Sequence, residues 1–364
     1  MKPALIIAIL FRSRGAIGGM AQRFAFLADY LICKGYPIEL LTTRSLLDHL
    51  RITPKPTMRI IEDQTANLPW ASYLMMGGII ASITAGRYSR VHIAGGGMLV
   101  MPALRAAKIS QTEKSVTFAS RTLEMAAYEK PEQMGKWRKI LDASDFIDVL
   151  NPGHNLAEWE GKISVSPGSF PSRYIEIPRN MVTERSPVVV FCGALEKTKN
   201  PILAVEAFSI FLSGDTHNAE LVMFGRGSLY SEVQQRMEAL NHHAGYEAAR
   251  FGPPEEYFAT LAHASVFLSL QDYDNYPSQS LMEAMALGCR CVATADGDTV
   301  MMFPDGGENI VLNSRQPHDF AHAISFLIAD RTASFINAEH IQANHSIETF
   351  SRYFLNFLGI NVDA

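Results

Sequence analysis

Apolar residues along the chain gather into short continuous runs, separated by segments with helical spacing. The run Leu5–Phe11 is uninterrupted, which is typical of a strand buried on both faces of a sheet. Residues 22–31 then repeat apolar side chains at the spacing of a helix. The next strand candidates are Ile38–Thr42, Val91–Ile93, Ser115–Phe118 and Phe146–Leu150. This alternation predicts a parallel sheet covered by helices on both faces.

The same alternation starts again after Asn180. Strands are expected at Val188–Cys192, Glu220–Phe224, Ala249–Phe251, Ser265–Leu270, Cys289–Thr294 and Asn309–Leu312. Between the two series, residues 166–186 are rich in proline, as an irregular connector is. We therefore expect an α/β protein of two domains, residues 1–180 and 181–345. A last segment with an apolar stripe predicts a helix over residues 346–360, which we expect to join the N-terminal domain.

Composition separates the two predicted domains further. The 364 residues carry a formal charge of −5, but residues 1–180 hold 22 Lys and Arg against 15 Asp and Glu, and the remainder holds 10 against 22. The halves therefore carry +7 and −12, which indicates either different partners or drift in surface composition. The four cysteines form no Cys-x-x-Cys pair, so no zinc site is predicted. The apolar run at Ala4–Phe11 is too short for a signal peptide or a membrane span, so we expect a cytoplasmic protein, soluble or peripheral to a membrane.

Open parallel sheets bind ligands in the loops that follow their strands. The first such loop is Arg12–Gly19. Gly18 and Gly19 would let backbone N–H groups approach a phosphate at the positive start of a helix, and Arg12 and Arg14 add charge. The alternative is a tight turn that binds nothing.

The second loop is Gly193–Pro201, at the start of the second series. Because Pro201 suits the first turn of a helix, Lys199 stands just ahead of a helix N-terminus. An ammonium there can neutralise a diphosphate, whereas the alternative is a solvated surface lysine.

The third loop, Gln271–Gly288, is the most informative. A helix is expected to begin near Ser278, with Ser278 or Ser280 as its N-cap. The backbone N–H groups of residues 278–281 would then face an anion. Glu283 either interacts favourably with the helix dipole or accepts hydrogen bonds from a diol such as a ribose.

Four ordered motifs between Val188 and Leu312 carry a family resemblance. Glu283–Thr294, which reads EAMALGCRCVAT, resembles the block E-A-M-A-x-G-x-P-V-V-A-T of the retaining glycosyltransferases of the GT-B fold, family 4 (glycosyl transferases group 1). Gly193–Asn200 is similar to that family's G-R-L-x-x-x-K-G/N loop. Phe224–Gly227 is similar to its G-x-G and Phe251–Gly252 to its V-x-F-x-G.

The resemblance implies two Rossmann-like domains whose parallel sheets face a central cleft. A nucleotide-sugar donor would bind the C-terminal domain, with Lys199 on the diphosphate and Glu283 on the ribose. Gly18 and Gly19 match glycines that close over the phosphates from the other domain. Further donor contacts would come from Gly193, Arg226, Gly252, Asn275, Tyr276, Ser278, Gln279, Ser280 and Leu281. The family also implies a retaining, metal-independent reaction without a cofactor.

The sequence departs from the family at two positions. Ala194 replaces the arginine of G-R-L, so Lys197, Arg226 or the Arg12/Arg14 pair must supply that charge, or donor affinity is low. The first glutamate of the family's E-x7-E pair falls on Asn275. We prefer Asp274, one residue earlier, as the catalytic acid that takes the sugar-binding role through a one-residue bulge. Otherwise Asn275 takes that role without charge.

The acceptor side is expected in the basic N-terminal domain. Arg14, His92 and Arg121 are the candidates, although a lone histidine on a strand is more often structural. A basic face suits a glycan or lipid-linked acceptor and the inner face of a cytoplasmic membrane, as in bacterial surface polysaccharide synthesis. We expect no nucleic-acid partner. The alternatives to a transferase are a sugar-nucleotide epimerase of the same fold and a catalytically silent sugar-nucleotide-binding relative.

Overall fold

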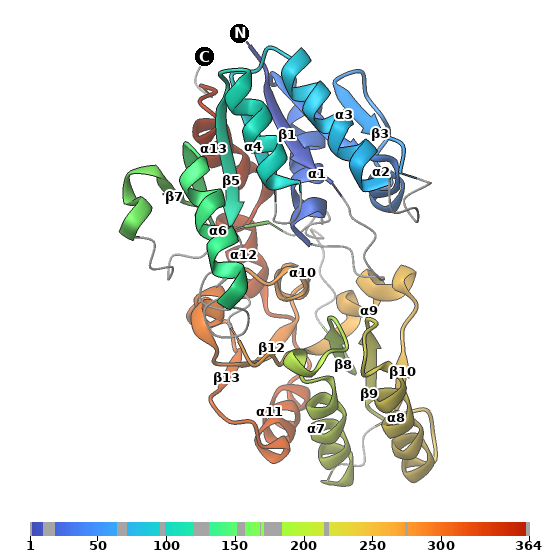
Figure 1. The fold of residues 1–364 in the computed structure, drawn as a ribbon. Coiled ribbons are helices and arrows are strands. Elements are labelled where there is room, and N and C mark those ends of the chain that lie inside the picture. Colours follow the sequence, from blue (N-terminus) through green and yellow to red (C-terminus); the bar gives the residue numbers. More distant parts are fainter. Residues whose placement is uncertain are drawn as a thin grey trace. The chain divides into compact units, whose positions relative to one another are not determined.

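The computed structural model describes residues 2–9, 19–63, 71–94, 99–118, 131–150, 157–167, 169–170, 184–214, 218–273 and 276–361 (Figure 1). The chain divides into two compact units. The first comprises Met1–Tyr174 together with Ile347–Ala364, and the second comprises Ile175–Ser346. Each unit is built around one sheet of parallel strands.

The first sheet has seven strands in the order β3-β2-β1-β4-β5-β6-β7. They are β1 (Ala4–Ala8), β2 (Ile38–Thr43), β3 (Met58–Ile61), β4 (Arg90–Ala94), β5 (Glu113–Phe118), β6 (Phe146–Val149) and β7 (Ile163–Val165). All neighbouring strands pair in parallel. The central strand β1 is buried along its whole length, as its continuous aliphatic run predicts.

Helices cover both faces of this sheet, because the side chains of a strand alternate between its faces. Ala4, Ile6 and Ala8 of β1 pack with α1 (Gly19–Cys33), α2 (Arg44–Leu50) and α13 (Ile347–Phe357). Leu5 and Ile7 pack with α3 (Ala71–Ala85), α4 (Val100–Ile109) and α6 (Pro131–Ala143). α3 and α4 lie side by side (Figure 1). The turn η1 (Ala157–Lys162) leads into β7.

The second sheet has six strands in the order β10-β9-β8-β11-β12-β13. They are β8 (Ser186–Cys192), β9 (Glu220–Phe224), β10 (Ala249–Phe251), β11 (Ala264–Ser269), β12 (Arg290–Thr294) and β13 (Ile310–Leu312). β8 lies between β9 and β11, so the strand order reverses there, and such a switch point is where open sheets of this kind bind ligands.

Two helical layers also cover the second sheet. One holds α7 (Pro201–Gly214), α8 (Tyr230–Ala244) and α11 (Pro317–Ala329). The other holds α9 (Tyr257–His263), α10 (Gln279–Ala286) and α12 (Phe335–Asn344). The short turns η2 (Lys197–Lys199), η3 (Pro254–Glu256) and η4 (Gly297–Met302) follow β8, β10 and β12. The predicted fold class, two Rossmann-like α/β domains with parallel sheets, is confirmed.

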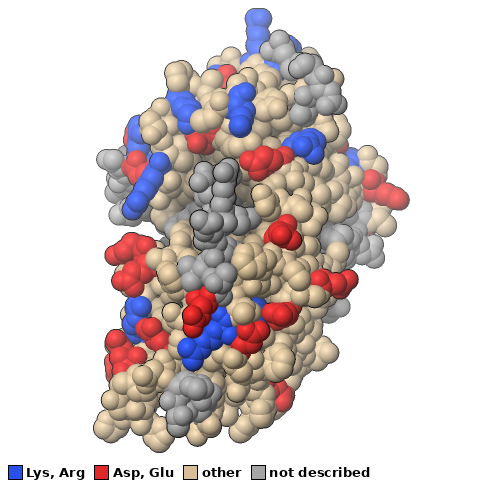
Figure 2. Space-filling model, turned by 180° about the vertical axis from the view of Figure 1, so that it is seen from behind, with Lys and Arg blue, Asp and Glu red and all other residues tan. Residues whose placement is uncertain are grey.

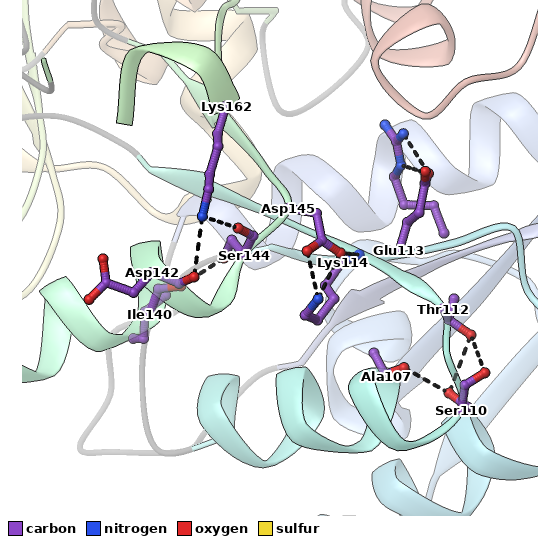
Figure 3. Close-up of polar contacts among 11 residues, drawn as sticks. Ala107, Ser110, Thr112, Glu113, Lys114, Ile140, Asp142, Ser144, Asp145 and Lys162 are labelled. Carbon is purple, nitrogen blue, oxygen red and sulfur yellow. Dashed lines mark hydrogen bonds and ion pairs between the residues drawn. The ribbon is translucent and has the colours of Figure 1, made fainter. Parts of the chain in front are cut away.

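Much of the basic charge of the first unit is used in internal contacts. On the face shown in Figure 2, its Lys and Arg side chains are interspersed with Asp and Glu. The ammonium of Lys114 lies 2.7 Å from the Asp145 carboxylate, and Lys162 donates to a main-chain oxygen of Ser144 at 3.0 Å, at the end of α6 (Figure 3). Arg90 pairs with Glu113 at 2.7 Å. These ion pairs cancel equal amounts of positive and negative charge, so the excess of +7 over residues 1–180 remains and comes from other basic side chains of that half.

Candidate active site

Lys199 lies at the carboxyl edge of the second sheet, in the loop that follows β8. It ends the turn η2, and Asn200 then takes a left-handed conformation (φ 52°) before Pro201 begins α7. The side chain is half-buried, with its ammonium 5.1 Å from the centre of the Tyr273 ring. Burial lowers the pKa of Lys199 to about 8. Among the residues that the structure describes, no carboxylate forms an ion pair with this ammonium, so its charge is available to an anion.

Glycines bring the loops after β8 and β9 into direct backbone contact. A Cβ at Gly225, whose φ is 145°, would lie 1.9 Å from the carbonyl oxygen of Gly193. A Cβ at Gly227 would lie 2.4 Å from the carbonyl oxygen of Leu195. The G-x-G pattern is therefore needed for close approach of the two loops. Arg226, between the two glycines, is exposed.

Gly252 is explained by packing. A Cβ there would lie 2.3 Å from the ring of Phe224, so a larger side chain would displace that ring. Nothing in this contact requires a ligand. Its predicted donor contact stays a prediction.

The helix α10 begins as the sequence predicts. Ser278 is its N-cap, and the Ser278 hydroxyl accepts from the backbone N–H of Leu281 at 3.5 Å. Gln279 and Ser280 occupy the first turn. The positive end of this helix therefore lies at the carboxyl edge of the sheet, where an anion is favoured.

Two predicted donor contacts from this segment need correction or restriction. The side chain of Leu281 is fully buried in the apolar cluster beneath α10, so that side chain cannot contact a nucleotide-sugar. The contact expected through its backbone N–H, which donates to Ser278 at 3.5 Å, stays a prediction. Tyr276 is 7% exposed and belongs to the same cluster, which limits it to contact through a small part of its surface. Both are primarily packing residues.

Glu283 lies in α10 with 7% of its surface exposed. Its neighbours include the hydroxyl of Tyr257, at the start of α9. Burial, followed by the nearby Cys192 and Glu283, raises the pKa of Tyr257 well above its ordinary value. The end of β8, the start of α9 and the helix α10 thus bring three polar groups together. Tyr257 and Cys192 were not expected from the sequence, because nothing local marks either residue.

Several predicted site residues lie outside the part of the chain that the structure describes. They are Arg12, Arg14, Gly18, Arg121, Asp274 and Asn275. Gly19 opens α1. The choice between Asp274 and Asn275 therefore stays a prediction.

The expectation that His92 contacts an acceptor is wrong. His92 has no exposed surface, and its ring lies between the hydroxyls of Ser115 at 3.0 Å and Thr117 at 3.1 Å. Burial, and then the charge of Arg90, lowers the pKa of His92 to about 3. Rings from α1 and α13, including Phe24 and Phe354, cover it. The neutral imidazole is part of the core.

Neither a metal centre nor a membrane span is found in the described part of the chain. His318 and His322 lie one turn apart on α11, but no group of three or more His, Cys, Asp or Glu among the described residues is placed to hold a metal ion. None of the described helices combines the length and the apolar character needed to cross a membrane.

Solved structures resemble the chain over nearly its whole length. The Anabaena protein Alr3699/HepE in complex with UDP and glucose has a TM-score of 0.70 at 11% identity, covering 99% of this chain and 100% of that one. A glycosyltransferase from Rickettsia africae has a TM-score of 0.69 at 14% identity, covering 98% of each chain. The likeness identifies the fold as GT-B.

The sequence of the second unit is similar to known glycosyltransferases. Residues 175–345 match the family described as glycosyl transferases group 1. D-inositol 3-phosphate glycosyltransferase of Nocardia farcinica is 26% identical over 193 residues, which are 51% of this chain and 41% of that protein. The Corynebacterium aurimucosum enzyme of the same name is 27% identical over 216 residues, 53% of this chain and 51% of that one. The chain spans about half the length of these curated relatives.

Proposed function

We propose that the protein is a glycosyltransferase that moves a sugar from a nucleotide-sugar donor to a glycan or lipid-linked acceptor. The observation that carries the proposal is the half-buried ammonium of Lys199, without a carboxylate partner among the described residues, next to the switch point of the second sheet. The family match covers this same unit. The N-terminus of α10 and the carboxylate of Glu283 supply the other two features that a nucleoside diphosphate requires.

The proposed chemistry follows from where charge develops. Breaking the bond between sugar and phosphate builds negative charge on the leaving diphosphate. Lys199 and the start of α10 stabilise that charge as the bond lengthens, so we propose a reaction that needs no metal ion. Glu283 accepts hydrogen bonds from the ribose hydroxyls and holds the donor in register. Following the family resemblance, we propose retention, with the acceptor hydroxyl attacking the face from which the diphosphate leaves and passing its proton to that phosphate.

The missing diphosphate arginine bears on donor affinity. Ala194 is exposed, and so is Lys197 in the same loop after β8. Arg226 is also exposed, and it lies in the loop after β9, whose backbone is hydrogen-bonded to the loop after β8. We propose that one of them supplies the second cation. If neither does, the protein is a silent relative that binds a sugar nucleotide without turnover.

Incubation with radiolabelled UDP-, GDP- and ADP-sugars separates these functions. Transfer to an acceptor, or slow hydrolysis of the donor, supports a glycosyltransferase. Interconversion of two sugar nucleotides would indicate an epimerase instead. Binding without turnover across the whole panel would contradict the enzymatic role.

For the acceptor we propose an anionic or lipid-linked molecule at the inner face of a cytoplasmic membrane, as in bacterial surface polysaccharide synthesis. Residues 64–112 contain no Asp or Glu. Within this range α3 exposes Ile80 and Ala81, and α4 exposes Arg105, Lys108 and Ile109, the last at 76%. We name these exposed residues the α3–α4 face. Its charge and apolar side chains complement a bilayer of anionic lipid.

A further inference from the structure

One arginine joins the loops that follow β11, β12 and β13 of the second sheet, and through Asp272 it is linked to the loop that follows β8. Arg315, which follows β13, donates from Nε to the carboxylate of Asp272 at 3.1 Å. Its Nη2 donates to the carboxylate of Asp296, which follows β12. The same nitrogen lies 3.4 Å from the carbonyl oxygen of Gln271. Arg315 thus bridges two carboxylates at the edge of the sheet where Lys199 lies.

Asp272 carries these contacts on to the lysine loop. Its carboxylate accepts from the side-chain amide of Asn200 at 2.5 Å, and its backbone N–H donates to the carbonyl oxygen of Thr198 at 3.0 Å. Both neighbours of Lys199 in the sequence are therefore bound to Asp272. Asp272 also directly precedes Tyr273, whose ring lies beneath the ammonium of Lys199.

The bridge to Arg315 also bears on whether the Asp272 carboxylate can pair with Lys199. Asp272 is a carboxylate held within hydrogen-bonding distance of the residue next to Lys199, and a flexible lysine side chain readily pairs with such a group. Arg315 and the Asn200 amide both donate to its Oδ1 and so hold the carboxylate in an orientation in which it forms no ion pair with the Lys199 ammonium. An ammonium that is not paired with an acid is the form that an incoming diphosphate can bind.

We propose that Arg315 is a positioning residue for Lys199: by bridging Asp272 and Asp296 it holds the lysine loop against Tyr273 and keeps the Asp272 carboxylate away from the ammonium. The inference rests on the proposed role of Lys199 in donor binding. It adds a residue that acts on Lys199 through the lysine loop and lies more than a hundred positions further along the chain. Asp272 and Asn200 act as the two intermediate contacts.

The test measures Lys199 itself as well as ligand binding. Lysines of the intact protein are labelled by reductive ¹³C-methylation, and the Lys199 signal is assigned by its absence in Lys199→Arg. In Arg315→Ala the freed Asp272 carboxylate favours the charged lysine, so the pKa of Lys199 should rise by about one unit or more. The dissociation constant for UDP should rise about five- to tenfold, because the ammonium is then partly neutralised.

A second substitution distinguishes positioning from general damage. Adding Asp272→Asn to Arg315→Ala removes the competing carboxylate but keeps an oxygen that accepts from Asn200, so both the pKa of Lys199 and the UDP affinity should return toward the wild-type values. Arg315→Lys, whose single ammonium cannot bridge both acids as a guanidinium does, should give an intermediate effect and serves if Arg315→Ala does not fold.

Arg236→Ala is the matched control, because Arg236 on α8 also bridges two carboxylates, those of Glu206 and Glu232. It should leave the pKa of Lys199 unchanged. The proposal is overturned if folded Arg315→Ala keeps the wild-type pKa of Lys199, or if Asp272→Asn does not reverse its shift. If wild-type protein binds none of UDP, GDP and ADP while the pKa responds as described, the proposed function fails and the positioning role stands.

Discussion

At the scale of single residues, the proposed donor site depends on one lysine that is neither fully solvated nor paired with a described acid. Replacing Lys199 by Ala removes charge that counts most when the diphosphate departs. We expect transfer to slow by about a hundred- to a thousandfold without loss of the fold. Lys197→Ala, an exposed neighbour in the same turn, is the control and should slow transfer less. Steady-state rates and melting temperatures measured together check this, and equal rates in the two variants would contradict the assignment.

The pH dependence of the same lysine gives a second prediction. Burial lowers the pKa of Lys199 to about 8, so the ammonium is present below that pH and is lost above it. We expect kcat/KM for the donor to fall about tenfold for each unit of pH above 8. Lys199→Arg, whose guanidinium stays charged, should retain whatever activity it has up to about pH 10. A profile that falls at the same pH in both proteins would assign the titration to another group.

The carboxylate of Glu283 gives a prediction about ribose. Glu283→Gln should weaken UDP binding more than Asn275→Ala does, because it removes the stronger acceptor for a diol. It should also lose most of the preference for UDP over 2′-deoxy-UDP. Calorimetric titration of both nucleotides measures this. An unchanged preference would show that the carboxylate does not contact the ribose.

At the scale of elements, a buried polar network ties α13 to the first sheet. Asp148 of β6 accepts from Thr117 at 2.7 Å and from the hydroxyl of Tyr353 in α13 at 2.7 Å. The hydroxyl of Thr117 donates its hydrogen bond to Asp148, so it can only accept from Nε2 of His92. The neutral imidazole therefore carries its hydrogen on Nε2. The last helix is therefore held by specific bonds as well as by its aromatic stripe.

The two titratable groups of this network oppose each other. Burial raises the pKa of Asp148 to about 6, despite its bonds to Tyr353 and Thr117, so its contribution to stability is present at low pH and is lost as pH rises through 6. The pKa of His92 is lowered to about 3, so its contribution is present above about 6.5 and is lost as pH falls toward 3. The two effects act in opposite directions over nearly the same range.

In Asp148→Asn, the pH dependence of stability that comes from His92 should no longer be offset by Asp148. The free energy of unfolding should increase between pH 4 and pH 7 by about 2 to 3 kcal/mol more in the variant than in the wild type, because the unfavourable ionisation of Asp148 is gone. Asp48→Asn removes an exposed carboxylate of the same unit and should leave the wild-type pH dependence in place. Urea unfolding at both pH values measures the difference. An equal increase in all three proteins would contradict the assigned ionisation.

Comparison of these elements with the sequence shows which features local pattern can predict. Central strands such as β1 and the cap at Ser278 depend on neighbouring residues, so their sequences predict them. The edge strands β3 and β7 were missed, because a partly exposed edge needs no continuous apolar run. Tyr257 and the Arg315 bridge depend on loops that meet only in the folded sheet. The burial of His92 likewise depends on α13, which arrives from the far end of the chain.

At the scale of the whole molecule, the opposed charges of the two halves acquire a more specific meaning. If the acidic second unit binds an anionic donor, as we propose, local features such as Lys199 and the start of α10 must outweigh its net charge. In the first unit Arg90 and Lys114 are paired with Glu113 and Asp145, so these two charges contribute little to the field that a partner meets. Residues 64–112 contain no Asp or Glu, and the exposed basic residues described there are Arg87, Arg105 and Lys108, of which the last two lie on the α3–α4 face.

Binding to lipid vesicles tests the role of this face. Arg105→Glu with Lys108→Glu should reduce co-flotation with vesicles that contain anionic phosphatidylglycerol by about tenfold or more, because each basic residue near such a surface contributes about 1 kcal/mol. Lys34→Glu with Arg51→Glu makes the same change of charge on exposed residues beside α1 and α2, the helices that cover the opposite face of the sheet, and should preserve binding. Raising the salt concentration should release the wild type from vesicles while leaving UDP affinity nearly unchanged, since the exposed face is screened and the half-buried Lys199 is screened less. If both double variants lose binding equally, vesicle binding depends on net charge alone and the α3–α4 face is not the docking surface.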